Sequence, residues 1–294
     1  MKIGLQINRF DWPGGPAAIG PTLARVTRAA DEAGFDSIWV MDHFFQIRGL
    51  GPAEDPMLEG WTALGFMAAT TSRARLGLMV GGVHYRLPGL WVKAATTLDV
   101  LSGGRAWLGI GAAWNEEESN ALGFPMPPLA TRFEMLEETL QIARAMWSGE
   151  QGSEETHDGR HYRATRLLNS PQAISRPRVP ILVGGGGEQK TLRLVAQYAD
   201  AANVFGDADR LRHKYAVLAE WCERVGRPPA EIERTTLQVA GPGRDAGGRA
   251  ALVERFGQLA EAGAQHVIVG IGPDGHEPDV IERWAEVIPA IHGL

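Results

Sequence analysis

Three short segments of the chain carry residues suited to chemistry. One contains a proton-transfer group, and the other two contain glycines that leave the backbone uncovered. The segment MDHFF at residues 41–45 places Asp42 beside His43, and a histidine can give or take a proton near neutral pH. The other two are GIGAAWNEEES at residues 109–119 and VGGGGEQKT at residues 183–191. Their glycines leave backbone N–H groups uncovered, which suits the binding of a phosphate group.

The four consecutive glycines at residues 184–187 fit neither of the common phosphate-binding motifs. A P-loop requires a second glycine directly before its Lys-Thr pair, and Gln189 stands in that place. The GxGxxG spacing fails at the same position, because Gly184 and Gly186 are followed by Gln189. The run is interpreted as a general anion site at the start of the next helix. A tight turn that needs positive φ is the alternative, although one or two glycines would serve it.

Motifs for metal or nucleophilic chemistry are missing from the sequence. His157 and His161 flank the turn residues DGR instead of sharing a helix face, and no HExxH element occurs, so no metal site is predicted. No GxSxG nucleophile elbow is present either. The single cysteine, Cys222, stands in an apolar helical pattern and is predicted to be a packing residue.

Eight short apolar runs are predicted to be the strands that position these segments. Continuous apolar runs, as opposed to alternating ones, are typical of parallel strands that are buried on both faces. The runs cover residues 2–7, 37–41, 76–80, 106–110, 180–184, 201–205, 236–240 and 266–270.

Helical spacing fills the gap after each run, which predicts a (β/α)8 TIM barrel formed by residues 1–294 as a single domain. A doubly wound open sheet is the alternative, but INRFDWPGGPAAIG lacks the glycine spacing of a dinucleotide turn. Residues 149–178 are polar and rich in turn residues. They are therefore predicted to form an insertion between the fourth helical unit (helix 4, residues 115–122 with 131–148) and the fifth strand (strand 5, residues 180–184), with a hairpin around HDGRHY. The helices are predicted over residues 17–33, 60–72, 88–101, 115–122, 131–148, 188–198, 208–225, 247–262 and 277–291.

In such a barrel, all the candidate segments follow strands and therefore meet at the C-terminal mouth, where barrel enzymes have their active sites. Gly81 and Gly82 also follow a predicted strand and allow close approach of a ligand. Trp114 offers a flat surface and Asn115 can cap the next helix. The acidic triplet at residues 116–118 is interpreted as mainly structural, since negative charge stabilises the first turn of a helix. The mouth is therefore predicted to hold a flat cofactor with a phosphate.

The overall composition is that of an ordinary water-soluble enzyme. The formal net charge is -6, which argues against a nucleic-acid partner because such surfaces are normally basic. No apolar run approaches the roughly 18 residues needed to span a bilayer, and no signal-peptide pattern begins the chain. No internal disulfide is possible with one cysteine, so the cytoplasm is the expected location and no membrane partner is expected.

Four segments together resemble the luciferase-like superfamily of flavin and deazaflavin oxidoreductases, and most closely its branch that uses coenzyme F420, an 8-hydroxy-5-deazaflavin. They are WVMDHFF, ATTLDVLSGGRAWLGIGAAWNEEESNALGFP, RFEMLEETLQIARAMWSG and PILVGGGGEQKTLRLVAQYADAANVF. The resemblance extends from residue 2 to about residue 290, and the central LDVLSGGR to NEEE block is its most specific part.

The resemblance implies the positions of a cofactor site. Asp42 and His43 match an acidic-His pair whose histidine is assigned proton transfer, and a non-proline cis peptide is expected at Met79–Val80, followed by Gly81. Two departures are noted: a glycine is more usual at Ala113, and a threonine at Gly81. The expected phosphate contacts are Gly111, Ala112, Ala113, Asn115, Val183, Gly184, Gly185, Gly186 and Gly187.

The resemblance also implies a function: hydride transfer between coenzyme F420 and a small organic substrate, with His43 as proton donor or acceptor. Trp12, Phe44, Trp114 and the insertion are expected to line the substrate pocket. The alternative is an FMN-dependent monooxygenase of the same superfamily, which would need a reductase partner, and a non-catalytic ligand-binding barrel is a third reading. A homodimer is expected because many members of the superfamily form one.

Overall fold

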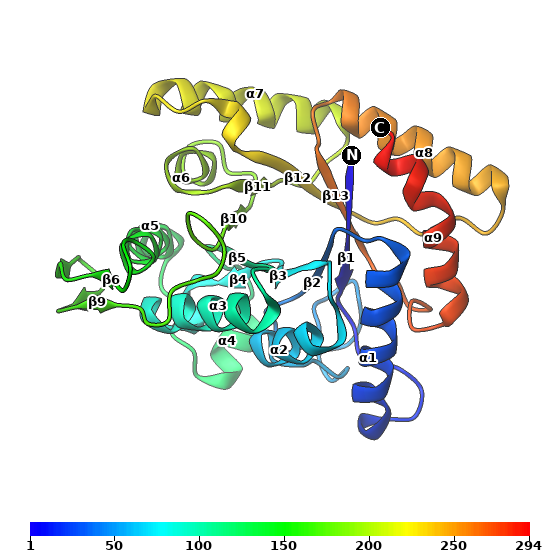
Figure 1. Cartoon of the computed structure of the whole chain (residues 1–294), viewed down its shortest axis with the longest axis horizontal. Coiled ribbons are helices and arrows are strands. Elements are labelled where there is room, and N and C mark those ends of the chain that lie inside the picture. Colours follow the sequence, from blue (N-terminus) through cyan, green and yellow to red (C-terminus); the bar gives the residue numbers. More distant parts are fainter.

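The chain folds into a closed barrel of parallel strands surrounded by helices, as predicted (Figure 1). The computed structural model describes residues 1–294. The sheet order is β10-β11-β12-β13-β1-β2-β3-β5-β4, and pairing of β10 with β5 closes the barrel. The strands of the barrel are β1 (Lys2–Ile7), β2 (Ser37–Val40), β3 (Arg75–Leu78), β4 (Gly81–Gly82), β5 (Ala106–Gly111), β10 (Ile181–Gly184), β11 (Ala201–Asn203), β12 (Glu233–Gln238) and β13 (His266–Gly270).

The helices cover the outside of the barrel and begin within three residues of their predicted positions. The largest shift is in α6, which begins at Thr191 because residues 188–190 form a turn after the glycines. The α-helices are α1 (Pro16–Ala33), α2 (Gly60–Thr70), α3 (Pro88–Ser102), α4 (Glu116–Leu122), α5 (Leu129–Met146), α6 (Thr191–Tyr198), α7 (Ala208–Val225), α8 (Ala246–Glu261) and α9 (Pro278–His292), with short 3₁₀ turns η1 (Val83–Tyr85) and η2 (Pro229–Glu231). No helix is long and apolar enough to cross a membrane.

Six strands differ from their predicted bounds by one to three residues, and for two of them the reason is visible. Strand β12 begins at Glu233, three residues before the predicted start, because polar residues open it and hydropathy alone does not detect them. Its pairing with β11 begins at Glu233, opposite Ala201. Strand β3 ends at Leu78, directly before the cis peptide bond between Met79 and Val80.

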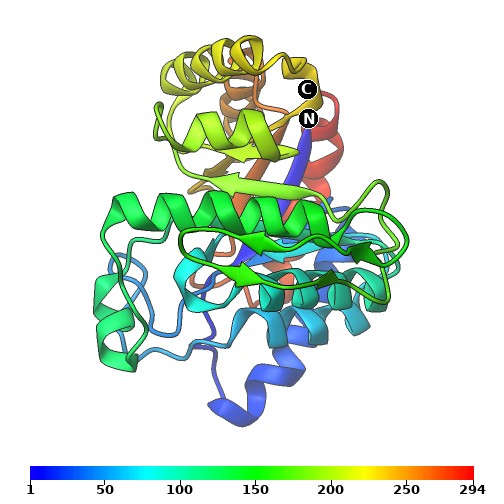
Figure 2. The same cartoon turned by 90° about the vertical axis from the view of Figure 1, so that its left-hand side faces the viewer.

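The insertion forms two small antiparallel ribbons along α5, and Figure 2 shows them beside that helix. One pairs β6 (Gly152–Ser153) with β9 (Leu167–Leu168), and the other, the predicted hairpin, pairs β7 (His157–Asp158) with β8 (Arg163–Ala164). The Glu138 carboxylate on α5 accepts hydrogen bonds from the backbone N–H groups of Arg160, His161 and Tyr162 at 2.9 to 3.2 Å. The hairpin is therefore attached to the outer side of α5.

The barrel interior is filled by large apolar side chains. Trp39 and Trp107 lie with ring centroids 6.2 Å apart, packed with Met79, Leu182 and Ile268. Gly77 makes room for both rings, since a Cβ there would lie 2.7 Å from Trp39 Cζ3 and 2.9 Å from Trp107 Cβ. The interior is thus a packed core, and any ligand site must lie above it at the strand ends.

The other end of the barrel is closed by a polar chain of side chains. Ser37 Oγ lies 2.9 Å from His266 Nε2, and His266 Nδ1 lies 3.0 Å from Glu233 Oε1. Lys2 Nζ donates to Glu233 Oε2 at 3.1 Å. Burial opposes ionisation of Glu233, but the hydrogen bond and charge of His266, with Lys2, outweigh it and lower the pKa of this carboxyl to about 2.

This lowered pKa predicts a loss of stability in acid. A carboxyl whose pKa falls from 4.5 to about 2 on folding stabilises the protein above pH 4.5, and that stabilisation disappears as the pH falls towards 2. The contribution is about 3 kcal/mol, at about 1.4 kcal/mol per pKa unit. Urea unfolding at several pH values should show a smaller acid-dependent loss for Glu233→Gln than for the wild type. Equal losses in the two proteins would contradict the assignment.

Candidate functional site

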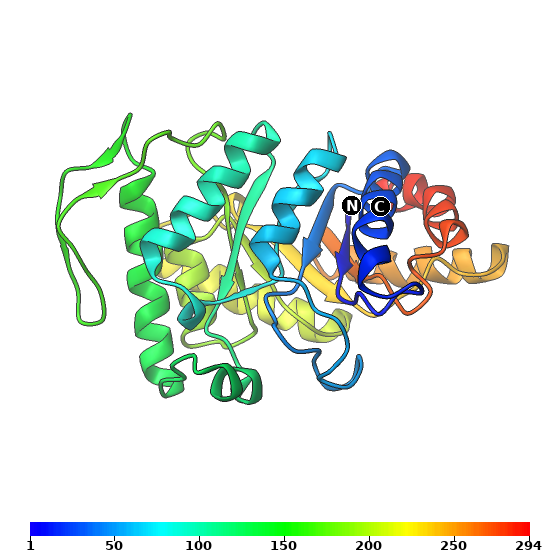
Figure 3. The same cartoon turned by 90° about the horizontal axis from the view of Figure 1, so that it is seen from below.

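A cavity of about 740 Å³ opens at the C-terminal ends of the strands. In Figure 3 the β1 arrow points away from the N-terminus, towards the side on which the loop after β2 lies. Strands β4, β10 and β13 contribute glycine backbone near this end, and the other barrel strands contribute side chains at or just after their ends. Of the predicted site residues, His43, Met79, Gly111, Trp114 and Gly185 line the cavity together with the neighbours described below.

His43 lines the cavity and is held by a buried carboxylate. Its Nδ1 lies 2.5 Å from Oε1 of Glu118, which leaves Nε2 as the nitrogen available to a ligand. The Trp114 ring packs edge-on against the imidazole at a centroid distance of 5.3 Å. The orientation of the imidazole is thus fixed from two sides.

Glu118 corrects the interpretation of the acidic triplet as mainly structural. Glu117 is exposed on the first turn of α4, whereas Glu118 is fully buried. Its Oε1 also accepts from the Tyr85 hydroxyl at 2.6 Å, and its Oε2 accepts from the backbone N–H groups of Phe44 at 2.7 Å and Phe45 at 3.1 Å. Position in a helical first turn predicted only a dipole interaction, and nothing in the local sequence indicates which of the three glutamates turns inward.

These donors keep the Glu118 carboxylate charged. Burial acts to raise the pKa of Glu118, but the hydrogen bond and charge of His43, with Tyr85 and the Phe45 N–H, lower it below its ordinary value. Burial and the bond to Glu118 raise the pKa of the Tyr85 hydroxyl, so Tyr85 remains a hydrogen-bond donor. The site therefore presents a permanent negative charge against the imidazole.

Asp42 lines the cavity, but both of its carboxylate oxygens are already engaged. Arg86 donates to each oxygen at 2.8 Å, and the Gly82 N–H donates to Oδ2 at 3.1 Å. Arg86 also donates to Glu59 Oε1 at 2.6 Å and lies over the Trp91 ring. Asp42 thus ties the end of β2 to the segment after β3 and has no free oxygen for a ligand.

A non-proline cis peptide joins Met79 to Val80, at the predicted position. The Met79 carbonyl accepts from Gln6 Nε2 at 3.1 Å, and both residues line the cavity floor. Gly81 follows in β4, where a Cβ would lie 2.3 Å from Trp91. This contact explains why a threonine cannot replace Gly81 without movement of that tryptophan.

The glycine run forms a side-chain-free cradle opposite Thr191 at the start of α6. Gly184, Gly185 and Gly187 line the cavity, whereas the predicted contacts Val183 and Gly186 do not. Gly185 has a φ of +127°, and a Cβ on Gly187 would lie 2.9 Å from Thr191 Oγ1. The glycines therefore keep open a space that side chains would fill, as an anion-binding backbone requires.

The segment after β5 forms the adjoining wall. Ala112, Ala113, Trp114 and Asn115 line the cavity, and Asn115 caps α4 by accepting from the Glu117 N–H at 3.2 Å. Ala113 has a φ of +60°, the left-handed region in which a glycine is favoured by roughly 1 kcal/mol. Its carbonyl accepts from Arg132 Nη1 at 2.9 Å, which holds this conformation.

Two residues and one segment that were expected in the substrate pocket do not line this cavity. Trp12 is buried against Phe10 and His276, and Phe44 stacks on Phe124 at 5.0 Å, so neither lines the cavity. The insertion contributes nothing to it either, because Glu138 attaches the hairpin to the outer side of α5. The residues that take their place lie on the loop after β2, on α5 and after β11 and β12, and are Ile47, Arg48, Gly49, Leu50, Leu129, Phe133, Phe205, Leu237, Gln238 and Val239.

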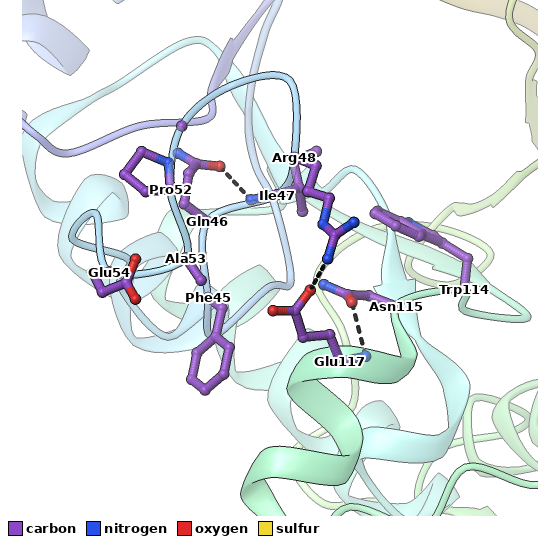
Figure 4. Close-up of a pocket in the computed structure, with 11 residues that line it drawn as sticks. Phe45, Gln46, Ile47, Arg48, Pro52, Ala53, Glu54, Trp114, Asn115 and Glu117 are labelled. Atoms are coloured by element: carbon purple, nitrogen blue, oxygen red, sulfur yellow. Dashed lines mark hydrogen bonds and ion pairs between the residues drawn. The ribbon is translucent and has the colours of Figure 1, made fainter.

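A second cavity of about 490 Å³ adjoins the first, and Figure 4 shows its lining. It lies between the loop after β2 and the start of α4, and it shares Ile47, Arg48, Trp114 and Asn115 with the main cavity. Arg48 Nη2 lies 3.4 Å from Glu117 Oε2 across this pocket. No group of three or more His, Cys, Asp or Glu side chains is placed so that it could hold a metal ion.

Comparison with known proteins agrees with this architecture. An F420-dependent glucose-6-phosphate dehydrogenase of Nakamurella multipartita is 33% identical over 236 residues, covering 76% of this chain and 65% of that protein. The chain thus spans slightly less than two thirds of that relative's length. An F420-dependent secondary alcohol dehydrogenase, solved with an F420-acetone adduct, superposes with a TM-score of 0.81 at 18% identity, covering 99% of this chain and 98% of that one.

A flavin enzyme shares the same fold. The oxygenating constituent of a Pseudomonas putida 3,6-diketocamphane monooxygenase, solved in complex with FMN, superposes with a TM-score of 0.72 at 17% identity, covering 99% of this chain and 96% of that one. The family model described as luciferase-like monooxygenase matches residues 3–265. The chain therefore belongs to the luciferase-like monooxygenase family.

Proposed function

We propose that this protein is an oxidoreductase that transfers a hydride between coenzyme F420 and an organic substrate bound at the barrel mouth. The single observation that carries the proposal is the imidazole of His43, held by a buried carboxylate at the edge of a cavity that also contains a glycine cradle. The F420-dependent relative described above supports the choice of cofactor. When bound, a deazaflavin supplies two-electron hydride chemistry.

The residues of the cavity fit such a group. The cradle of Gly184, Gly185 and Gly187 would make room for a phosphate beside the Thr191 hydroxyl. The Gly185 N–H already donates to the Asn203 carbonyl at 3.0 Å, so the backbone donor would be the N–H of Gly187. Met79 and Val80 would lie under a flat ring, because they form the cavity floor beside His43. Ala112 and Ala113 would border it on the β5 side.

In this proposal His43 moves the proton that balances the hydride. An alcohol carbon that loses a hydride leaves its oxygen with one proton to give up, and Nε2 of His43 accepts it. In the reverse direction the same nitrogen returns that proton to the carbonyl oxygen. Glu118 acts through His43 and not on the substrate, because its carboxylate holds the imidazole through Nδ1.

A binding titration tests the cofactor. Purified protein should quench the fluorescence of oxidised coenzyme F420 with a dissociation constant in the micromolar range, about -8 kcal/mol, and should bind FMN more weakly. Micromolar binding of FMN with none of F420 would establish the flavin monooxygenase instead, and a reductase partner would then be required. Binding of a cofactor that no substrate ever reoxidises or reduces would favour a non-catalytic barrel.

The expected homodimer and cytoplasmic location remain part of this proposal and rest on the family resemblance. Light scattering of the purified chain tests the first, because a dimer has twice the mass of the 31.8 kDa protomer. A mass of one protomer at micromolar concentration would contradict it.

Gly187→Ala is expected to weaken cofactor binding about tenfold, equivalent to about 1.4 kcal/mol. The new Cβ would lie 2.9 Å from Thr191 Oγ1 and would enter the space proposed for the phosphate. Fluorescence titration measures the dissociation constant, and Gly65→Ala on α2 is the matched control because a Cβ there meets no atom within 4 Å. An unchanged dissociation constant in the Gly187 variant would place the phosphate elsewhere.

A further inference from the structure

We propose that the substrate of this site is an uncharged, largely hydrocarbon molecule, and that phosphorylated sugars are excluded. The inference rests on the proposed function, since it identifies the substrate class of the same cavity. It is supported by the apolar side chains that line the cavity outside the glycine cradle, and by the ion pairs that the nearby charged groups already form.

The rim beside the cradle, at the ends of β11 and β12, is apolar and uncovered. Phe205 follows β11, and Leu237 and Val239 stand at the end of β12, directly across the barrel from the segment after β3. Phe205 is 51% exposed and Val239 is 93% exposed. Apolar side chains held open to water inside a concave site gain favourable free energy when a hydrocarbon covers them.

Two further elements extend this apolar wall. Leu129 and Phe133 project from the first turns of α5, and Ile47 and Leu50 from the loop after β2. Leu129 is also more than half exposed. A ligand above the proposed ring position would therefore meet hydrocarbon on several sides. The polar groups on this part of the wall are the uncharged amides of Asn8 and Gln238 and, at the exposed rim, the guanidinium of Arg48.

A single cation, Arg48, lines the cavity, and it lies at the exposed rim, where it pairs with Glu117. The only charged or titratable side chains other than Tyr85 that line it are Asp42, His43 and Arg48. Asp42 is bound by Arg86, and Arg48 leans across the neighbouring pocket to Glu117, as Figure 4 shows. A phosphate in such surroundings would lose its hydration without an unpaired positive charge to compensate it.

The lysines nearest the cradle do not supply a positive charge for a second phosphate. Lys214 Nζ lies 2.5 Å from Glu188 Oε1, and Lys190 lies over the Phe133 ring, and neither lines the cavity. The backbone cradle can hold one anionic group, and the proposed cofactor uses it. A sugar phosphate would thus bring a charge and several hydroxyl groups to a wall whose single cation, Arg48, is paired with Glu117 and which offers few hydrogen-bond partners.

Displacement of a neutral fluorescent probe, N-phenyl-1-naphthylamine, tests the inference. The competitors are 1-phenylethanol, its para-carboxylate 4-(1-hydroxyethyl)benzoate, and glucose 6-phosphate, each added to the apoprotein and to the F420-loaded protein. We expect 1-phenylethanol to displace the probe at a concentration at least about tenfold below that of its carboxylate, and glucose 6-phosphate not to displace it. Displacement by either anion at an equal or lower concentration would overturn the inference.

A charged variant gives a second test. Val239→Lys is expected to weaken 1-phenylethanol binding about fivefold or more and to narrow or reverse the preference over the carboxylate, because an ammonium group then faces the ligand. Leu87→Lys is the matched control, since Leu87 is 70% exposed before α3 and does not line the cavity. An unchanged preference in Val239→Lys would show that the substrate does not meet this wall.

Failure of the proposed function is separately visible in these experiments. If F420 does not bind, the measurement on F420-loaded protein cannot be made. Probe displacement from the apoprotein still reports whether the cavity prefers neutral ligands. If F420 binds and the anions compete best, the cofactor assignment stands and the substrate class is wrong.

Discussion

Replacing His43 with alanine is expected to lower turnover by about 10²- to 10⁴-fold, the usual contribution of a positioned acid or base. His43 is the only lining side chain that can exchange a proton near neutral pH, since Asp42 is held by Arg86 and Tyr85 by Glu118. The dissociation constant for the cofactor should change little, because the cradle is formed by other residues. Steady-state kinetics with F420 and a neutral alcohol, together with fluorescence titration, separate the two effects.

His213→Ala is the matched control for this experiment. His213 is exposed on α7, bonded to Glu188 and outside the cavity, so its removal should leave turnover unchanged. Turnover of His43→Ala within about twofold of wild type would remove the imidazole from the proposed mechanism, because general acid–base catalysis contributes far more than that.

Glu118→Gln is expected to lower turnover by about 10²-fold or more and to destabilise the fold by roughly 3 kcal/mol. The amide brings two donors to a place where four donors already converge, so at least one buried N–H or O–H group loses its partner. The imidazole also loses its counter-charge, and wrong orientation of a catalytic histidine is known to cost several orders of magnitude in rate. Urea unfolding and steady-state kinetics measure the two effects.

A pH profile distinguishes a positioning role from a merely structural one. In Glu118→Gln the pH profile of turnover should change, because a neutral amide replaces the carboxylate that contacts the His43 imidazole. Glu117→Gln, its exposed neighbour on α4, should retain the wild-type profile and stability. Reduced turnover of Glu118→Gln with an unshifted profile would mean that the carboxylate serves only the fold.

The barrel could be predicted from the sequence because its strands are buried on both faces. Runs such as residues 2–7 and 266–270 are continuous and apolar, and both have the predicted bounds. The predicted start of β12 was three residues too late because the strand opens with Glu233 and Arg234, which are polar residues at the closed end of the barrel. Their partners, such as Asp200, Gly263 and His266, come from other strands or loops and leave no local signal.

The cofactor side of the site was more predictable than the substrate side. No residue type other than glycine leaves space for a ligand at these positions, so Gly111, Gly184 and Gly185 can be recognised in the sequence itself. The roles proposed for them stay predictions until binding is measured. The apolar wall consists of ordinary side chains such as Leu129 and Val239. In the sequence they cannot be told from core residues, and only the fold shows that they are exposed.

Glu118 shows a second limit of the sequence. Three glutamates in a row on a first helical turn have the same local environment, and only the docking of α4 against Phe44 and Tyr85 selects one for burial. The insertion shows a third limit: its hairpin was predicted, but the Glu138 contacts that direct it away from the mouth depend on packing across α5.

The glycine cradle also determines how an anion held there would respond to its surroundings. Its lining consists of glycine backbone and the hydroxyl of Thr191, neither of which gains or loses a proton between pH 4 and pH 10, roughly the range in which carboxyl, imidazole and amine side chains titrate. Retention of a phosphate-bearing ligand should thus vary little over that range except through the ligand's own ionisation. A change of turnover with pH would therefore come from groups outside the cradle, and the anchored molecule would stay in place while turnover changes.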